Sequence, residues 1–419
     1  MIPLSLAEIA RITGGRLDGG ADPAAVVTGP VVIDSRRARP GGLFAAVEGE
    51  RVDGHDFAAA ARDAGATAML GTRPAGVPGL LVDDVPTALA WLAQEVVARL
   101  PEVTIAGLTG SAGKTSTKDL TAQLVERLGP TISPEGSWNN EFGFPLTVLR
   151  ADQRTRFMVL EMAARTEARI VTFGLAAGAG GGPPGAGGTA AGPPDFAAAG
   201  VRLDDLGRPS FTLITPAGSV PVRMGLHGAH QIPNALAAAA TAAELGLGLD
   251  GIADGLATAT ARSRWRMEVR EAPGGVTVIN DAYNANPESV RAALDALGHM
   301  ARGGRAFAVL GQMNELGDES RDSHLEAGAH AAGTGVTGLI VVGKEAEPIL
   351  DGAMATSGWH GEAIGVPTGA EAVAALRARL AAGDVVLVKA SRSVGLETVA
   401  ADLLSQSASS SASEKETAQ

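Results

Sequence analysis

A glycine-rich turn between an apolar strand and a helix constrains this chain more than any other feature. The run Val103-Thr-Ile-Ala-Gly-Leu108 reads as a short strand, and the glycine turn follows it as Thr109-Gly-Ser-Ala-Gly-Lys-Thr115. The apolar residues that come next fall on one helical face: Leu120, Leu124, Val125 and Leu128. A strand, a glycine turn, Gly-Lys-Thr and a helix are typical of a triphosphate-binding loop.

The residue types in this turn predict how ATP and Mg²⁺ are held. Backbone N–H groups surround phosphate oxygens, a lysine adds positive charge, and a hydroxyl coordinates the metal. We therefore expect ATP to be bound by Gly110, Ser111, Ala112, Gly113, Lys114, Thr115 and Ser116. The glycines stand at 107, 110 and 113, whereas the common spacing would place one at Leu108, so the motif is a variant. A chance glycine turn is the alternative, and the surrounding strand, lysine, threonine and helix disfavour it.

A second apolar strand, Phe157-Met-Val-Leu-Glu161, ends in an acid. In P-loop proteins such an acid commonly binds the metal or orients water. We therefore expect Glu161 to be a metal ligand together with Thr115, and a catalytic residue together with Lys114. The alternative is a carboxylate at a strand end that faces solvent.

Composition excludes several classes of protein. A length of 419 residues predicts two to four domains. A net charge of −12 argues against a general nucleic-acid or anionic-membrane binder, and the absence of cysteine excludes thiolate metal sites. The N-terminus has no basic segment, and no stretch approaches the roughly 20 apolar residues of a membrane span. These features predict a cytoplasmic protein.

The chain divides into three predicted α/β domains. The first, residues 1–100, begins with the capping box Ser5-Leu-Ala-Glu8. The second, residues 101–261, holds the P-loop and a low-complexity linker at 176–194. The third, residues 262–404, alternates predicted strands (276–280, 307–310, 339–342, 385–389) with predicted helices (287–297, 320–332, 370–380). This doubly wound, Rossmann-like pattern has no GxGxxG after its first strand, so a dinucleotide is not expected. Residues 405–419 are expected to be a disordered tail.

Three polar clusters remain outside this framework. They are Asp34-Ser-Arg36, then Ser137-Trp-Asn-Asn-Glu141, then a scattered group formed by His230-x-x-x-Asn234, Arg266-Met-Glu268 and Asn280-Asp-Ala-Tyr-Asn-Ala-Asn-Pro287. Taken singly, each fits ordinary loop chemistry. Asp281 and Asn284 fit helix capping before Pro287 equally well.

Taken together and in this order, the motifs resemble the Mur ligase family over nearly all of residues 1–404. The resemblance rests on the P-loop, the Asn139-Asn140-Glu141 segment and three later runs: Asp281-Ala-Tyr-Asn-Ala-Asn286, Leu310-Gly-Gln-Met-Asn-Glu-Leu-Gly317 and Lys389-Ala-Ser-Arg392. Within the family, the chain looks most like the type that adds D-alanyl-D-alanine. The Asp-Asn-Pro-Arg motif of the diamino-acid-adding sister and the N-terminal GxG turn of the earlier sisters are both absent.

The resemblance implies three domains, which bind the UDP-sugar, hydrolyse ATP and close over the nucleotide. It implies Mg²⁺-dependent amide formation between UDP-N-acetylmuramoyl-tripeptide and D-alanyl-D-alanine through an acyl phosphate, in peptidoglycan precursor synthesis, by a monomer. Asn234, Arg266 and Asp281 would serve the nucleotide. The substrates would be bound by Ser35, Arg36, Asn139, Asn140, Asn284 and Asn286.

The chain departs from the family after Glu161. There the family carries a long segment with a metal-binding His, in an Asn-x-Gly-x-x-His motif, and a carbamylated lysine that bridges to a second Mg²⁺. Here Met162–Arg169 leads at once to the strand-like run Ile170–Gly174, and no lysine occurs between Lys118 and Lys344. We therefore expect the second Mg²⁺ site and the carbamate to be absent.

The short connection also constrains the sheet. A parallel crossover needs a dozen or more residues. The two strands must therefore pair antiparallel, lie apart, or leave the P-loop sheet incomplete with apolar surface exposed. A shortened, impaired paralogue and an error in the gene sequence both remain open.

Two rival functions are also open. One is a non-catalytic relative that binds the nucleotide or the muropeptide. The other is a P-loop kinase or ATPase with different substrates, which the Asp34–Arg36 and Asp281–Pro287 clusters disfavour.

Overall fold

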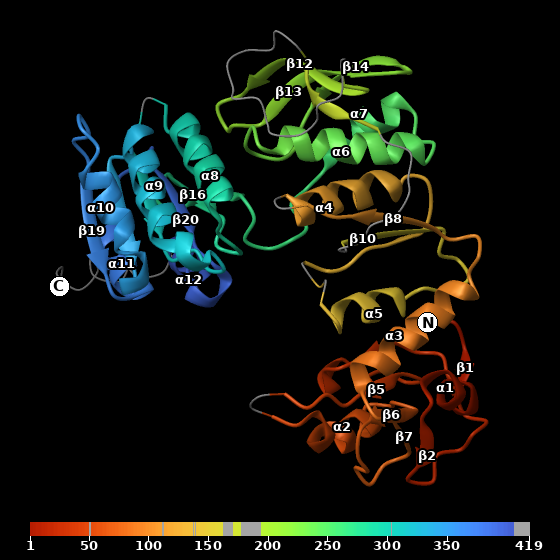
Figure 1. The fold of residues 1–419 in the computed structure, drawn as a ribbon. Coiled ribbons are helices and arrows are strands. Elements are labelled where there is room, and N and C mark those ends of the chain that lie inside the picture. The colour runs from red at the N-terminus through yellow and green to blue at the C-terminus, as the bar shows by residue number, and fades with distance from the viewer. Residues whose placement is uncertain are drawn as a thin grey trace, which may run out of the picture. The chain divides into compact units, whose positions relative to one another are not determined.

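The computed structural model describes residues 1–49, 52–110, 113–136, 138, 140–161, 171–176, 194–302 and 304–405 (Figure 1). The chain forms two compact units. The first comprises Met1–Gly110, Thr117–Ala168 and Glu244–Leu247, and the second Ser111–Ser116, Arg169–Ala243 and Gly248–Gln419. The predicted linker at 176–194 and the predicted tail at 405–419 lie outside the described residues, apart from their outermost positions.

The first unit begins with a five-stranded sheet in the order β2-β7-β6-β5-β4, in which only β2 runs antiparallel to its neighbour. Its strands are β2 (Arg16–Asp18), β4 (Val31–Val32), β5 (Leu43–Ala45), β6 (Ala68–Gly71) and β7 (Gly79–Leu81). Strands β1 (Leu4–Ser5) and β3 (Val26–Val27) form a separate antiparallel pair. The helices are α1 (Leu6–Thr13), α2 (Ala58–Asp63) and α3 (Val85–Ala98), with short 3-10 turns η1 (Ser35–Arg37) and η2 (Gly54–Phe57).

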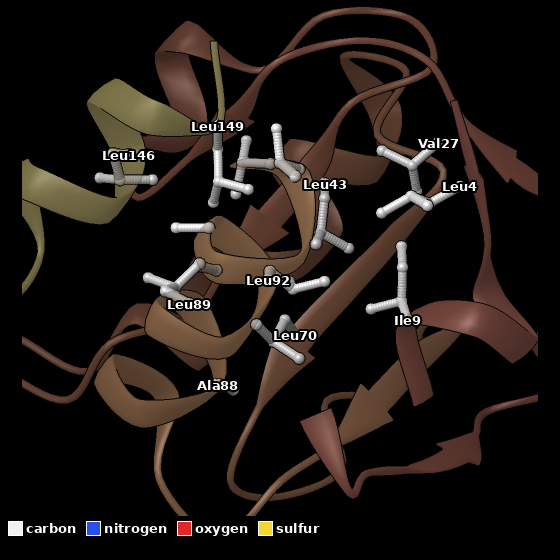
Figure 2. Packing of buried hydrophobic residues seen from close by; sticks show 14 of the residues in the cluster. Leu4, Ile9, Val27, Leu43, Leu70, Ala88, Leu89, Leu92, Leu146 and Leu149 are labelled. Atoms are coloured by element: carbon white, nitrogen blue, oxygen red, sulfur yellow. The ribbon is translucent and has the colours of Figure 1, made fainter. Parts of the chain in front are cut away.

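The predicted capping box at the first helix is confirmed. The Ser5 hydroxyl accepts the Glu8 N–H, and the Glu8 carboxylate accepts the Ser5 N–H at 2.9 Å. Gly14 ends the helix in the left-handed region, with φ of 64°. Figure 2 shows the hydrophobic core of this part of the unit, in which Leu89 and Leu92 of α3 pack with Leu70 of β6.

The same unit contains the sheet that leads into the P-loop. Its strands are all parallel in the order β8-β10-β9, with bounds β8 (Thr104–Leu108), β9 (Thr131–Ile132) and β10 (Phe157–Glu161). The helices that follow its strands are α4 (Lys114–Val125), whose first three residues belong to the second unit, and α5 (Gly143–Val148).

Successive β10 residues face opposite sides of this sheet. Phe157 and Val159 pack with Val125 of α4, whereas Met158 and Leu160 join the core that α3 and α5 share. Ile105 of β8 lies in register with Met158 and is 42% exposed, so the cover on that face ends before β8.

In the second unit, a four-stranded sheet follows in the order β11-β12-β13-β14. Its strands are β11 (Phe173–Leu175), β12 (Phe196–Leu203), β13 (Pro209–Thr215) and β14 (Gly218–Arg223), and only β11 is parallel to its neighbour. Strand β11 therefore belongs to a different sheet from β10, so the antiparallel pairing, one of the three arrangements left open by the sequence, is not formed by these two strands. Helices α6 (Gln231–Glu244) and α7 (Leu249–Thr258) follow.

The C-terminal part of the second unit is the predicted Rossmann-like fold. Six strands run in the order β15-β16-β20-β17-β18-β19, and only β15 is antiparallel. They are β15 (Glu268–Ala272), β16 (Val276–Asn280), β17 (Ala306–Leu310), β18 (Gly338–Val342), β19 (Glu362–Val366) and β20 (Val385–Lys389).

Helices cover both faces of this sheet. Leu387 of β20 packs in the core under α8 (Pro287–Met300), α9 (Ser320–Gly333) and α10 (Pro348–Met354). Val386 and Val388 pack on the other side, under α11 (Gly369–Arg377) and α12 (Glu397–Leu404). Short turns η3 (Gly317–Glu319), η4 (Lys344–Ala346) and η5 (Arg392–Val394) complete the domain. In the part of the chain that the structure describes, no helix is long and apolar enough to cross a membrane.

Candidate functional site

The P-loop motif lies at the start of α4, as predicted. Lys114, Thr115 and Ser116 form the first turn of the helix, where backbone N–H groups favour an anion. Gly113 has φ of 73°, and a Cβ built there would lie 2.5 Å from Oδ1 of Asn234. A glycine is therefore required both by the backbone and by the asparagine. Ser111 and Ala112 lie outside the described residues.

Two predicted nucleotide residues from later in the chain meet this turn within the second unit. Asn234 of α6 lies against Gly113, and its Nδ2 donates to Oε1 of Gln231 at 3.0 Å. The Arg266 Nη2 donates to Oγ1 of Thr115 at 3.2 Å across 151 positions of sequence. Lys114, Thr115, Asn234 and Arg266 are thus brought to one place in the fold.

The backbone around Arg266 has an unusual conformation. The residues on both sides of it, Trp265 and Met267, have positive φ values of 59° and 48°. Both N–H groups are held, by Glu268 Oε1 at 2.8 Å and by Asp281 Oδ1 at 3.0 Å respectively. The guanidinium lies 4.4 Å from the ring centroid of Tyr283, a cation–π geometry. The arginine is therefore fixed from several directions.

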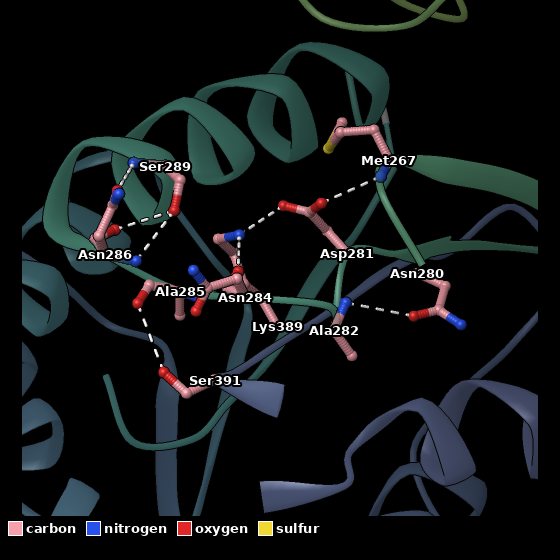
Figure 3. A network of polar contacts seen from close by, with 10 residues as sticks. All are labelled: Met267, Asn280, Asp281, Ala282, Asn284, Ala285, Asn286, Ser289, Lys389 and Ser391. Atoms are coloured by element: carbon pink, nitrogen blue, oxygen red, sulfur yellow. Dashed lines mark hydrogen bonds and ion pairs between the residues drawn. The ribbon is translucent and has the colours of Figure 1, made fainter. Parts of the chain in front are cut away.

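Asp281 is the centre of a polar network in the C-terminal domain (Figure 3). Its Oδ2 accepts a hydrogen bond from Nζ of Lys389 at 2.6 Å. The same Nζ also donates a hydrogen bond to the carbonyl of Asn284 at 2.8 Å. Lys389 is 2% exposed, so its charge is compensated almost wholly by protein groups. Sequence analysis singled out the Lys389 motif but assigned this lysine no role.

Helix capping accounts for one predicted substrate residue. The side chain of Asn286 caps α8, accepting the Ser289 N–H at 2.8 Å, whereas Asp281 and Asn284 do not cap it. Asn284 Oδ1 accepts the N–H of Ala285 at 2.9 Å. The prediction of a capped helix near Pro287 is therefore confirmed, but the capping residue is Asn286 and not Asp281 or Asn284.

His230 is a further polar residue beside this network. Its Nδ1 is buried and has no hydrogen-bond partner among the described residues. Burial lowers the pKa of His230, Asp281 raises it, and Lys389 lowers it, with burial the largest effect. The neutral imidazole is therefore the favoured form. The His230-x-x-x-Asn234 spacing was the sequence signal for it.

In the first unit, Glu161 is 3% exposed, so the solvent-facing alternative is wrong. It stands in register with Leu108, the last residue of β8, at the carboxyl edge where parallel α/β sheets bind ligands. Asn140 lies three residues before α5, and its Oδ1 accepts the N–H of Gly143, the first residue of that helix, at 2.8 Å. Asn139 lies outside the described residues.

Ser35 and Arg36 lie on η1 at the other predicted substrate segment. Arg36 makes a bidentate ion pair with Asp34, at 2.9 and 2.8 Å, while its side chain stays 88% exposed. This pair holds the pKa of Asp34 below its usual value. A cavity of about 300 Å³ adjoins the segment, and its walls come from β4, η1, α5 and the loop before it: Pro30, Val31, Val32, Ile33, Asp34, Arg37, Glu135, Trp138, Leu146, Thr147 and Arg150.

No group of three or more His, Cys, Asp or Glu side chains gathers as a metal site within the described ranges. The hydroxyl of Thr115 and the buried carboxylate of Glu161 are oxygen donors, which Mg²⁺ prefers, and Mg²⁺ usually takes its remaining ligands from phosphates and water. The donor types present therefore fit one Mg²⁺ that travels with a nucleotide.

Three family models match separate stretches of the chain. They are the catalytic domain of the Mur ligase family at residues 30–97, the Mur ligase middle domain at 108–178 and the glutamate ligase domain of Mur ligases at 265–392. A curated relative, the UDP-N-acetylmuramoyl-tripeptide–D-alanyl-D-alanine ligase of Mycobacterium tuberculosis, is 40% identical, and the match covers 96% of this chain and 97% of that one. The chain belongs to the Mur ligase family.

Other Mur ligases extend the comparison. The enzyme of the same name from Escherichia coli is 33% identical over 95% of this chain and 98% of its own. The crystal structure of MurF from Acinetobacter baumannii is 26% identical with a TM-score of 0.80, covering 96% of this chain and 99% of that one. MurF ligase from Thermotoga maritima, solved with ADP, is 26% identical with a TM-score of 0.70, covering 89% and 96%. The predicted family and three-domain α/β architecture are confirmed.

The alignment length bears on the predicted deletion. The match to the Mycobacterium tuberculosis Mur ligase runs over 501 positions, whereas this chain has 419 residues. The relative must therefore contain segments that this chain lacks.

Proposed function

We propose that this Mur ligase is an ATP-dependent enzyme that joins D-alanyl-D-alanine to UDP-N-acetylmuramoyl-tripeptide and releases ADP and phosphate. The observation that carries the proposal is the convergence of Lys114, Thr115, Asn234 and Arg266 in a chain whose motifs span the three Mur ligase domains. Relatives named for this reaction cover almost the whole chain.

The reaction has two steps. A carboxylate oxygen of the tripeptide attacks the γ-phosphorus of ATP, and the bond to the ADP oxygen breaks. The amine of D-alanyl-D-alanine then attacks the acyl carbon, loses a proton, and phosphate leaves. Two anions must approach in the first step, so positive charge around the phosphates is the main catalytic requirement. Mg²⁺ supplies part of this charge when it is bound.

The protein groups that we assign to this requirement are Lys114 and Arg266. Their charges would act on the transferred phosphate, and the N–H groups at the start of α4 would hold the other phosphate oxygens. Asn234 and Asp281 would orient the nucleotide. Thr115 and Glu161 would be the protein ligands of one Mg²⁺, since both side chains offer the oxygen donors that this ion prefers.

For the acceptor substrate, we assign the Ser35–Arg36 segment and the loop at Asn139–Asn140, with Asn284 as a further candidate. Arg36 and the neighbouring cavity offer a guanidinium and an apolar wall to a nucleotide-sugar. Asn286 is also proposed to contact the substrate, although its side chain caps α8. We further propose that the enzyme works as a monomer in the cytoplasm.

The second Mg²⁺ site is where we expect this chain to differ from other Mur ligases. We propose that it lacks the carbamylated lysine and its partner His, so that one Mg²⁺ remains and turnover is reduced. The alternative function is a relative that binds nucleotide or muropeptide without turnover.

ADP release should decide between the two functions. In the presence of Mg-ATP, the ligase releases ADP only when UDP-N-acetylmuramoyl-tripeptide and D-alanyl-D-alanine are both present, and mass spectrometry detects the pentapeptide product. A non-catalytic relative binds the ligands in calorimetry and releases no ADP. ADP release that needs neither substrate would indicate a different ATPase.

A further inference from the structure

Lys118 is a buried lysine that the proposed reaction does not use. It lies on α4, one helical turn after Lys114, and its side chain is fully buried. Its Nζ donates to the carbonyls of Pro134 at 2.7 Å and Gly136 at 2.8 Å, and lies 2.8 Å from Oδ1 of Asp119. A buried ammonium is costly unless such partners are present. All three donors of this lysine can therefore be used inside the protein.

The two carbonyls belong to the loop that precedes the Ser137–Asn140 segment. A third carbonyl of the same loop, that of Ser133, accepts Nη1 of Arg150 at 3.1 Å. Gly136 has φ of 61°, a conformation that favours glycine. The loop is thus held through three of its backbone carbonyls by two cations, Lys118 and Arg150, in addition to the burial of Pro134.

The same loop reaches the N-terminal substrate segment. Glu135 lies 3.5 Å from Nη2 of Arg37 on η1, and Glu135 and Trp138 both line the cavity of about 300 Å³. A continuous set of contacts therefore runs from the P-loop helix through Lys118 and the 134–136 backbone to the cavity wall. All of these residues belong to the first unit.

We propose that Lys118 is a positioning residue, which fixes the 133–136 loop against the P-loop helix and so shapes the cavity for the acceptor nucleotide-sugar. This inference rests on the proposed function for the identity of the acceptor. It predicts an effect on acceptor binding and little effect on ATP, although Lys118 stands four residues from Lys114.

Steady-state kinetics of full-length variants test the functional part. Lys118→Met should raise KM for UDP-N-acetylmuramoyl-tripeptide by about tenfold or more, the effect of losing one to two hydrogen bonds to a charged group, with KM for ATP changed by less than about twofold. Lys118→Arg, which keeps the charge and the donors, should recover part of the loss. Lys344→Met, at an exposed lysine of the other unit, is the matched control. Equal rises in both KM values, or no rise in folded Lys118→Met, would overturn the proposal.

Hydrogen exchange without substrate tests the positioning directly. Lys118→Met should accelerate amide exchange in peptides spanning residues 133–149 and leave those of strand β17 unchanged. If Lys118→Met does not fold, Lys118→Gln, which removes the charge but keeps two N–H donors, replaces it in both measurements. Unchanged exchange in 133–149 overturns the proposal. A wild-type protein that binds no muropeptide instead overturns the proposed function, and exchange then decides the positioning role alone.

Discussion

The Nζ of Lys389 lies 2.6 Å from Oδ2 of Asp281, although the two residues are 108 positions apart in sequence. They stand at the carboxyl ends of β20 and β16, which are parallel neighbours in the C-terminal sheet. Sheet pairing therefore creates the ion pair and directs Asp281 towards the N–H of Met267, next to Arg266.

Breaking this pair should be strongly destabilising. Lys389→Met leaves the Asp281 carboxylate without its main cation in a largely buried place, a change that costs about 3–5 kcal/mol. The double variant Asp281→Asn with Lys389→Met should lose less than the sum of the single variants. Urea unfolding measures all three, with Lys344→Met as control. Additive losses would show that the pair contributes no coupling.

Removing the P-loop lysine should abolish most turnover. Lys114→Ala is expected to lower ligase turnover by about 10²–10³-fold, the scale for loss of one preorganised charge-stabilising group. Circular dichroism melting verifies that the variant is folded. Unchanged turnover in folded protein would remove this loop from the catalytic site.

Arg36 should contribute to binding of the acceptor. Arg36→Ala in the full chain is expected to weaken binding of UDP-N-acetylmuramoyl-tripeptide by about tenfold or more, as for loss of a hydrogen bond to a charged group. Isothermal titration calorimetry measures the affinity. Arg16→Ala, at an exposed arginine on β2 of the same unit, should bind like the wild type. Identical affinities for Arg36→Ala and the wild type would show that Arg36 does not contribute to acceptor binding and serves only to pair with Asp34.

The capping box should make stability depend on pH in acid. Backbone and hydroxyl hydrogen bonds from Ser5, with Arg99, lower the pKa of Glu8 from 4.5 to about 2. The folded pKa lies below the unfolded one, so the contribution is full above about pH 4.5 and is lost as pH falls towards 2. Because the side chain is partly exposed, about 1 kcal/mol is the scale expected.

Glu8→Gln tests this dependence by urea unfolding between pH 7 and pH 3. The stability difference between wild type and variant should shrink as the pH falls. Glu102→Gln, at an exposed glutamate, is the control. A difference that is constant over this range contradicts the assignment.

Restoring the missing segment should raise both activity and stability. We expect a chain that carries a relative's segment between Glu161 and Phe173 to turn over about tenfold faster or more, because a second metal adds several kcal/mol of charge stabilisation. The added cover over β8 should also raise the melting temperature. Turnover of the present chain equal to that of an intact Mur ligase would show that the second metal site is dispensable here.

Buried parallel strands were the easiest elements to predict. The bounds of β10, β16 and β20 agree with the predicted ones, because each is a continuous apolar run between turn residues. Strand β19 and the antiparallel strands β12–β14 were missed. None of these strands is a continuous buried apolar run, since β19 has no buried residue, β14 has one, and buried residues alternate with less buried ones in β13.

For the candidate site, motifs located the residues but not their partners. The sequence singled out Arg266 and Asp281, yet contacts across 151 and 108 positions depend on sheet order and helix packing, which no local pattern encodes. Lys118 was assigned no role from the sequence, because the carbonyls that it binds lie 16 and 18 positions away, in a loop that no local pattern connects to it. Asn286 shows the converse, since a polar residue within a family motif also serves as a helix cap.

The left-handed backbone at Trp265 and Met267 has an energetic consequence. Each such non-glycine residue costs about 1–2 kcal/mol relative to a relaxed conformation, and neither residue is of the Asn or Asp type that tolerates it. The hydrogen bonds from both N–H groups offset part of that cost only while Glu268 and Asp281 stay in place. The segment therefore stores backbone strain. The orientation of the Arg266 side chain is maintained at a cost to the stability of the domain.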